Sequence, residues 1–193
     1  DIIELVQYER VDITSEVSLA NLFKRLDKNL FAVVNLAYPK GKGYGTKLEN
    51  VELANFNENI NLHLGGYFAV MKASALFFSK KNIKGRVISA SSIYGVVMPK
   101  FELYEDLNMT SPVEYTCIKH SIVALTKYFA KYYKANGVSF NCISYGGILD
   151  KQNSIFINRY KSNCGLIGMI DEPKQMSSPI LYFLNDNSIA VNG

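Results

Sequence analysis

Cysteine is scarce in this sequence, and the number and spacing of the cysteines exclude two common kinds of structural site. The 193 residues contain three of them, Cys117, Cys142 and Cys164. An odd number of widely spaced cysteines without a C-x-x-C pair supports neither a disulfide framework nor a zinc site. A reducing cytoplasm is the simplest setting for them. We therefore expect a cytoplasmic protein without a bound metal.

Long apolar runs and strong charge are missing as well. No run of about eighteen apolar residues predicts a membrane span, and no basic and apolar leader predicts secretion. The formal net charge is only +4. The stripe of Lys127, Lys131 and Lys134 is typical of a solvated helix face, because no stacking platform accompanies it. We expect neither a membrane nor a nucleic acid as partner.

Apolar residues are abundant, and their pattern predicts a single α/β domain over residues 1–193. They make up 48% of the chain, which is enough for a core. Residues 85–92 (GRVISASS) and 138–143 (VSFNCI) each predict a buried strand, with a helix between them and polar residues where the strands end. In open α/β sheets, ligands bind at the carboxyl ends of the strands. We therefore expect the functional site at this edge.

The helix between these strands carries the residues that suggest a reaction. Ser111 would cap the helix, Pro112 would take its first position and Glu114 would complete a capping box. Tyr115 then lies in the first turn, with Lys119 one turn further along the same face. The lysine ammonium would lower the phenol pKa from its usual ~10, so that Tyr115 could exchange protons near neutrality. Taken alone, the pair fits a packed tyrosine beside a solvated lysine equally well.

Three segments in order resemble the short-chain dehydrogenase/reductase family over most of the chain. GRVISASSIYG is similar to the family's serine-bearing strand, YTCIK to its tyrosine and lysine helix, and SFNCISYGGI to its loop beside the nicotinamide. The resemblance implies a Rossmann-like, doubly wound parallel sheet with helices on both faces, and an oxidoreductase that uses NAD or NADP. It implies that Tyr115 is the acid/base, that Lys119 lowers its pKa and holds the nicotinamide ribose, and that Ser92 anchors the substrate.

The resemblance also implies cofactor contacts at the strand ends. Asp12 is similar to the aspartate that borders the adenine pocket, and Leu36 lies in a turn that usually reads Asn-Asn-Ala-Gly. Tyr145 stands where the family usually has proline, and it would crowd or reshape the nicotinamide side. Together with Tyr115 and Lys119, the implied contacts are Asp12, Ile13, Asn35, Leu36, Ala37, Tyr145, Gly146 and Ile148.

His63 falls on the position of the family's helix asparagine when the segment GYF is aligned with Gly-x-Phe. With a free pKa of ~6.5, it could relay protons as a fourth catalytic residue. Asn59 and Asn61 are competing registers, and a hydrogen-bonded packing role is the alternative for the histidine. Leu36, His63 and Tyr145 differ from the residues that the family usually has at these positions. The alternative interpretation of the whole protein is therefore a catalytically silent Rossmann-like subunit or binding module.

The segment between Ser92 and Tyr115 is long and, with NLAYPKGKGYG and NLHLGGYF, resembles the branch of flagellin modification protein A. This branch points to an alcohol on a sugar or nucleotide sugar as the substrate. The insert would fold over the pocket, where aromatics could stack on a ring and carboxylates could accept hydrogen bonds. The alternative is a loop that packs on the next subunit. The residues concerned are Phe101, Glu102, Tyr104, Glu105 and Asp106.

The glycine-rich turn Thr-Gly-x-x-x-Gly-x-Gly, with which the family begins, is missing near the amino terminus. The chain begins close to the family's third strand, continues with a helix from about Ser15, and stops before the last strand. We expect a fragment that lacks the first βαβ region and the last strand. The residues that distinguish NAD from NADP would lie in the missing part. These residues alone should be poorly soluble or partly unfolded, which a cooperative melt would contradict.

A second glycine-rich segment, GKGYG at residues 41–45, follows the strand predicted at residues 31–35. It resembles a loop that holds phosphate groups. No helix opens on it at the spacing that a dinucleotide fingerprint needs. We therefore expect a mobile surface loop, which in the related branch would border the substrate pocket.

The two long helices are apolar over more than one face, which exceeds the stripe that a sheet can cover. In the family these helices pair with their copies in other subunits. The resemblance therefore implies a symmetric homo-oligomer, a dimer or a tetramer. The alternative is a monomer with exposed aromatic residues. The residues concerned include Phe68, Leu76, Tyr128 and Tyr132.

Overall fold

A parallel sheet of three strands forms the centre of the molecule. The computed structural model describes residues 6–26, 29–166 and 168–193. Within them, the strands are β1 (Ala32–Asn35), β2 (Arg86–Ser92) and β3 (Ser139–Tyr145), in the order β1-β2-β3. Ser92 pairs with Tyr145 at the carboxyl end of the sheet. The predicted strands are therefore present and parallel. The strand expected at the amino terminus falls largely on residues 1–5, outside the described residues.

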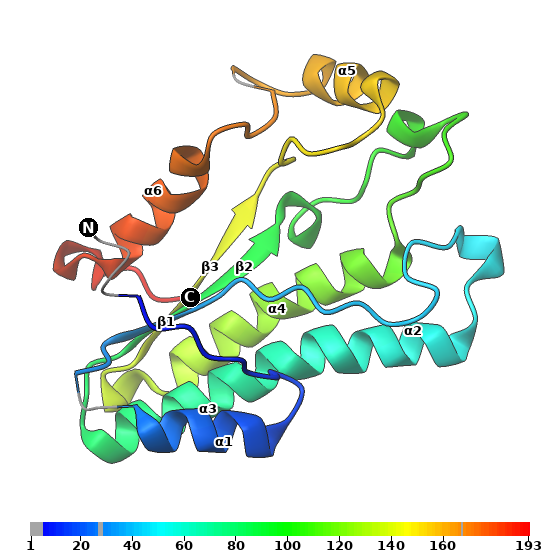
Figure 1. The fold of residues 1–193 in the computed structure, drawn as a ribbon. Helices are drawn as coiled ribbons and strands as arrows, with labels where there is room; N and C mark the ends of the chain where they lie inside the picture. The colour runs from blue at the N-terminus through cyan, green and yellow to red at the C-terminus, as the bar shows by residue number, and fades with distance from the viewer. Residues whose placement is uncertain (1–5, 27–28, 167) are drawn as a thin grey trace.

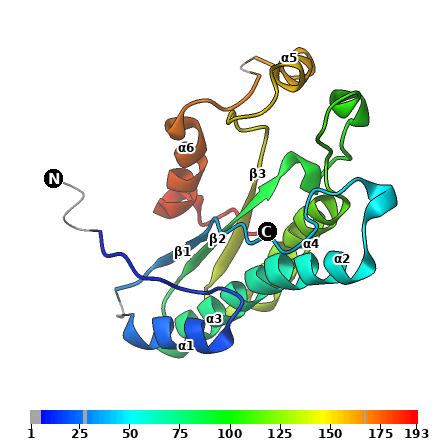
Figure 2. The same ribbon diagram turned by 45° about the vertical axis from the view of Figure 1, so that its right-hand side comes forward.

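Helices cover both faces of this sheet (Figures 1 and 2). On one face lie α1 (Glu16–Arg25), α3 (Gly66–Lys81) and α4 (Val113–Tyr132), and on the other lies α6 (Pro173–Leu184). A shorter helix, α2 (Leu53–Ile60), continues through a π-helical turn at Asn61–Gly65 into α3. The last, α5 (Ser154–Ser162), lies beyond the carboxyl end of β3. The prediction of a doubly wound α/β fold is confirmed. No helix among the described residues combines the length and apolarity that crossing a bilayer requires.

The starts of two helices show where local sequence signals succeed and fail. α1 begins as predicted, since the Ser15 side chain accepts a hydrogen bond from the Ser18 amide at 3.2 Å. The capping box predicted for α4 is wrong. Pro112 is extended, with ψ of 138°, so α4 starts one residue later and the buried Ser111 hydroxyl has no partner among the described residues. Glu114 is therefore the second helical residue, and its side chain is buried at 1% exposure.

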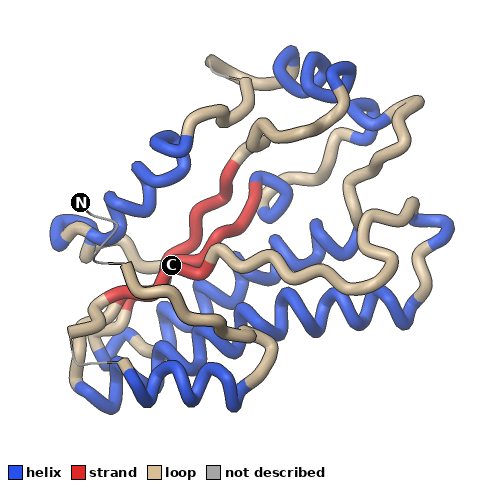
Figure 3. The backbone as a smooth tube through the Cα atoms, viewed as in Figure 1, coloured by secondary structure: helices blue, strands red, loops and turns tan. Residues whose placement is uncertain are grey.

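The apolar core holds α3 and α4 against the sheet. Met71 and Phe78 of α3, Val87 of β2, and Phe140 of β3 belong to one buried cluster together with Phe129 of α4. A second cluster lies past the carboxyl end of the strands, where Leu103 packs with Phe156, Tyr160 and Met169. This second cluster joins the segment after β2 to α5. Figure 3 shows that the segments beyond β2 and β3 are mostly loops and short helical turns.

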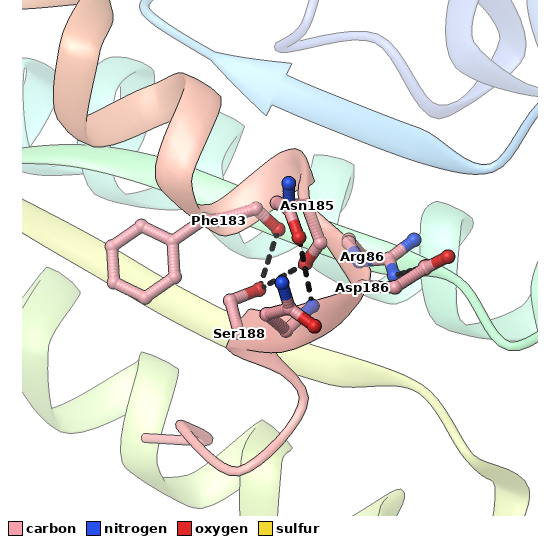
Figure 4. A network of polar contacts seen from close by, with 6 residues as sticks. Arg86, Phe183, Asn185, Asp186 and Ser188 are labelled. Carbon is pink, nitrogen blue, oxygen red and sulfur yellow. Dashed lines mark hydrogen bonds and ion pairs between the residues drawn. The ribbon is translucent and has the colours of Figure 1, made fainter.

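The carboxyl-terminal residues bind to the same sheet. Arg86 at the start of β2 pairs with Asp186, in a short turn where the Ser188 hydroxyl donates to the Asn185 carbonyl at 2.7 Å (Figure 4). Further on, the Phe140 amide of β3 donates to the Asn192 side chain at 2.9 Å. These contacts fix the segment after α6 beside β3.

Candidate active site

Three predicted residues meet at the carboxyl end of β2. Ser92 is the last residue of β2, and Tyr115 and Lys119 lie in the first two turns of α4. The Ser92 hydroxyl accepts a hydrogen bond from the Tyr94 amide at 3.2 Å and lies close enough to the Tyr115 phenol to lower its pKa. The Lys119 ammonium lies 5.6 Å from the centre of the Tyr115 ring. Ser92 and Lys119 are 6% and 4% exposed, so the group is largely shielded from water.

Backbone contacts between β2 and α4 hold this group together. The Lys119 ammonium donates to the Ala90 carbonyl at 3.0 Å, and the Ser91 hydroxyl donates to the Lys119 carbonyl at 3.0 Å. Gly95 fills the space between them. A Cβ on Gly95 would lie 2.5 Å from the Ser91 hydroxyl oxygen and 2.7 Å from the Lys119 carbonyl oxygen. A glycine is therefore required where the chain leaves β2 so close to α4.

Burial dominates the electrostatics of the group. Burial raises the pKa of Tyr115, and the nearby Ser92 hydroxyl acts in the opposite direction. Burial also lowers the pKa of Lys119 to about 8. The expected lowering of the phenol pKa is therefore not found in the protein alone. The physical reason is that both side chains are removed from water, which disfavours their charged forms.

His63 packs beside this group, in the π-helical turn before α3. Its ring is fully buried, 5.0 Å from the Tyr38 ring and 5.3 Å from the Tyr67 ring, and neither ring nitrogen has a hydrogen-bond partner among the described residues. Burial and, secondarily, the charge of Lys119 lower its pKa to about 3. Of the competing registers, Asn59 uses its amide to hold a loop and Asn61 faces solvent. The relay role of His63 stays a prediction.

The buried, neutral His63 should make the protein sensitive to acid. Its folded pKa of about 3 lies below the unfolded value of ~6.5, so the unfolded state binds more protons below that value. His63 should therefore lower the free energy of unfolding by about 1.4 kcal/mol for each pH unit below ~6.5. Urea denaturation between pH 7 and 5 measures this slope, which His63→Phe should reduce. His120→Gln, at the chain's other histidine, should leave it unchanged; equal slopes in all three proteins would contradict the assignment.

A cavity of about 720 Å³ opens beside Tyr115 and Lys119, at the carboxyl ends of all three strands. It brings together seven of the predicted cofactor contacts. They are Leu36, Ala37, Tyr115, Lys119, Tyr145, Gly146 and Ile148. Asn35 lies behind this wall, where its side-chain oxygen accepts from the Ala37 amide at 3.1 Å and its buried side-chain nitrogen has no partner among the described residues.

Besides Asn35, two predicted cofactor residues do not line this cavity. The Asp12 carboxylate accepts hydrogen bonds from the Thr14 amide and hydroxyl at 2.9 and 2.7 Å, which lower its pKa. Ile13 packs against Gly66 at the start of α3, where a Cβ would come within 2.7 Å of the isoleucine side chain. In the described residues, Asp12 thus stabilises the turn before α1, and Ile13 packs that turn against α3. Their role at an adenine pocket stays a prediction.

Tyr145 lines the cavity as predicted, and it also makes a contact with α6 that the sequence did not indicate. The residue is 8% exposed, and its hydroxyl donates to the Met176 carbonyl of α6 at 2.7 Å. The ring thus forms part of the cavity wall and ties the end of β3 to α6. Whether it crowds a bound nicotinamide stays a prediction.

Several tyrosines around the site were missed by sequence reasoning. The Tyr38 ring lies 5.9 Å from the Tyr115 ring and 5.5 Å from the Lys119 ammonium. Tyr67 lies at the same 5.5 Å from that ammonium, and its hydroxyl donates to the Asn35 carbonyl at 3.2 Å. The only available signal was position, since Tyr38 follows the end of a strand in a chain that has 13 tyrosines.

The insert between Ser92 and Tyr115 borders the cavity with one of its predicted residues. Tyr104 lines the cavity, whereas Phe101 is 63% exposed. The expectation for the three acids is wrong, because all of them face solvent and none lines this cavity. The reason is that Leu103 is buried against α5, which turns its neighbours outward. The acids are Glu102, Glu105 and Asp106.

Comparisons with known proteins agree with this geometry. The family model described as enoyl-(acyl carrier protein) reductase matches residues 4–193. The chain is 37% identical over 190 residues to post-translational flagellin modification protein A of Campylobacter coli, covering 95% of the chain and 73% of that protein. It is 26% identical over 199 residues to 2,5-dichloro-2,5-cyclohexadiene-1,4-diol dehydrogenase of Sphingobium indicum, covering 96% and 73%. A short chain dehydrogenase from Leptospira borgpetersenii, solved with bound NAD+, superposes with a TM-score of 0.86 at 28% identity, covering 96% and 71%.

Proposed function

Because the chain belongs to the enoyl-(acyl carrier protein) reductase family of short-chain dehydrogenases/reductases, we propose that it transfers a hydride between NAD or NADP and an alcohol or carbonyl substrate. The observation that carries this proposal is the meeting of Ser92, Tyr115 and Lys119 at the carboxyl end of β2. A hydroxyl, a phenol and an ammonium in contact provide a substrate anchor, an acid/base and a positive charge.

The residues around the cavity fit a nicotinamide nucleotide. Lys119 uses one ammonium proton on the Ala90 carbonyl, which leaves two donors for ribose hydroxyls. Asn35 has a buried side-chain nitrogen without a partner among the described residues, at the end of β1. Leu36, Ala37 and Ile148 would cover the apolar faces of the ring. When bound, the cofactor supplies or accepts the hydride.

The protein's own residues handle the proton. In the reducing direction, the neutral Tyr115 phenol donates its proton to the substrate carbonyl oxygen, while Ser92 holds that oxygen in place. The raised pKa of Tyr115 keeps the phenol protonated for this step. Lys119 then stabilises the phenolate through its charge. In the oxidising direction, the phenolate takes the proton from the substrate alcohol. The rings of Tyr38 and Tyr67 help to exclude water from the group.

For the substrate, we propose an alcohol or ketone on a sugar or nucleotide sugar, used in the modification of flagellin. The support comes from the name of the relative in Campylobacter coli and from the tyrosines beside Tyr115. Tyrosine rings offer flat apolar faces with a polar edge, which suits polyhydroxylated rings. Tyr94, Tyr104 and Tyr160 line the cavity next to the proposed reaction centre.

The test uses the full-length protein with NAD+ and NADP+ and a panel of sugar alcohols and nucleotide sugars. Reduced nicotinamide is followed by its absorbance, and cofactor binding by its fluorescence. Turnover with either cofactor supports the proposal, and the preferred cofactor distinguishes NAD from NADP. If the protein binds the cofactor but turns over no substrate of the panel, the proposal fails, and the protein is a catalytically silent binding module.

We also propose that the protein forms a symmetric homo-oligomer through α3 and α4. Phe68 and Leu76 of α3 are 43% and 54% exposed, and Tyr128 and Tyr132 of α4 are 64% and 67% exposed. Soluble monomers rarely leave so many large apolar side chains uncovered on neighbouring helices. Sedimentation of the full-length protein measures its mass, and a monomer at micromolar concentration would refute this assembly.

A further inference from the structure

The glycine-rich loop after β1 is held in place beside the reaction centre. The Gly41 amide donates to the Asn59 side chain at 2.7 Å, and the Asn59 amide donates to the Lys42 carbonyl at 3.0 Å. Asn59 itself is 1% exposed, in α2. Gly43 and Gly45 have φ of +65° and +87°, which glycine adopts without strain. The loop is thus anchored to α2 at Gly41 and Lys42, and its predicted mobility stays a prediction.

This loop forms one wall of a second cavity, of about 510 Å³, which we call the recognition groove. The opposite wall comes from the insert, through Tyr94 and Tyr104. These residues and Tyr115 also line the cavity beside Lys119, so the two cavities are adjacent and share part of their walls. A substrate whose reacting carbon lies at Tyr115 would therefore have the groove beside it. The residues that define the groove here are Tyr38, Lys40, Tyr44, Tyr94, Tyr104 and Tyr115.

Lys40 gives the recognition groove its charge. It is the only charged residue among the described residues that line the groove. Its ammonium lies 4.9 Å from the centre of the Tyr38 ring and 5.7 Å from that of Tyr44, and no carboxylate among the described residues pairs with it. Lys40 is exposed, and it places a positive charge without an ion-pair partner beside the two rings.

We propose that Lys40 is a specificity-determining residue, which binds a phosphate or carboxylate group of the substrate while the tyrosine rings of the groove pack on its sugar ring. The step from the Tyr115 ring to the Tyr38 ring is 5.9 Å, and that from Tyr38 to the Lys40 ammonium is 4.9 Å. Tyr38 thus adjoins both Tyr115 and Lys40, so one sugar ring packed on Tyr38 would lie near both of them. The inference rests on the proposed function and narrows its substrate to anionic sugars.

Glu114 is the acidic group whose charge acts on the tyrosines of this groove, and it does not pair with Lys40. Its charge acts on Tyr38 and Tyr44, as the raised pKa values of both phenols reflect after the larger effect of burial. Its side chain is 1% exposed and does not line the groove. An anion in the groove therefore makes no direct contact with this carboxylate, whereas Lys40 lines the groove.

The experiment measures binding to the full-length protein saturated with cofactor, by calorimetry, with glucose 1-phosphate, glucuronate and glucose as probes. At least one anionic probe should bind about tenfold more tightly than glucose, which is the effect of one charge-assisted contact. Lys40→Met should remove this preference and leave glucose binding unchanged. Lys42→Met is the matched control, because Lys42 lies in the same loop and does not line the groove; it should behave as the wild type.

The stronger anionic probe identifies the acidic group as phosphate or carboxylate. Equal affinity for all three probes, no binding of either anion, or an unchanged preference in Lys40→Met would overturn the inference. The readout does not require turnover. If anionic sugars bind preferentially through Lys40 but the protein never reduces the cofactor, the inference about Lys40 stands and only the enzyme proposal fails. If the protein turns over neutral sugars and shows no preference for anionic ones, the enzyme proposal stands and the inference about Lys40 fails.

Discussion

Replacing Tyr115 by phenylalanine should lower kcat by roughly 10²–10⁴-fold, the usual contribution of a positioned general acid or base. The variant keeps the ring, which lies 5.9 Å from the Tyr38 ring and 5.6 Å from the Lys119 ammonium. It loses only the hydroxyl and its polar interaction with Ser92, a loss of at most about 1 kcal/mol of stability. The cofactor site and the fold should therefore survive, while the group that moves the proton is gone.

The measurement compares kcat and cofactor affinity in the full-length protein and two variants. Tyr38→Phe is the matched control, since it removes a neighbouring hydroxyl that contacts Tyr44 instead of Ser92. Burial raises the pKa of Tyr38 to about 12, so this phenol stays neutral. The control should keep kcat within a few-fold of the wild type. Full activity in Tyr115→Phe would dispose of the proposed mechanism, and an equal loss in Tyr38→Phe would move the acid/base role away from Tyr115.

The sheet and the reacting group could be predicted because short-range patterns determine them. Val87, Ile88 and Phe140 lie in short apolar segments whose length and flanking glycines favour buried strands, and all three are buried. Ser92, Tyr115 and Lys119 then follow from topology, since the end of β2 and the start of α4 lie at the same edge of a parallel sheet. Because Tyr115 and Lys119 are four residues apart in a helix, their side chains lie on the same face, one turn from each other.

What could not be predicted depends on burial, which a local pattern does not reveal. The capping signal at Ser111 and Glu114 failed because Pro112 remains extended and Glu114 packs inward. The direction of the pKa shift of Tyr115 depends on how much water the surrounding tyrosines exclude, and those tyrosines come from distant segments. Likewise, the insert's acids point outward because Leu103 is buried against α5, a contact between residues more than fifty positions apart in sequence.

The second large effect is expected at Lys119, whose buried charge lowers the stability of the folded protein although the proposed reaction needs it. Burial lowers its folded pKa to about 8, below the unfolded value of ~10.4. The unfolded state therefore binds more protons between these values, and this lysine costs the folded state roughly 3 kcal/mol below pH 8. The cost fades as pH rises through this window, because the lysine is then neutral in both states. Its hydrogen bond with the Ala90 carbonyl offsets about 1.5–3 kcal/mol of this cost, because the donor is charged.

Lys119→Met should therefore be as stable as the wild type at pH 7, or more stable by about 1–2 kcal/mol, since methionine fills a similar space without a charge. Turnover should fall by roughly 10²-fold or more, because the phenolate of Tyr115 loses its stabilising cation. Urea denaturation at pH 7 and 10 gives the difference in stability between the two proteins, which should shrink at the higher pH; the tyrosines titrate in both and cancel. Lys127→Met, at an exposed position of the same helix, should change neither quantity. A Lys119→Met protein that is clearly less stable at pH 7 would mean that the contacts of the ammonium outweigh its burial, so that Lys119 supports the fold as well as the proposed reaction.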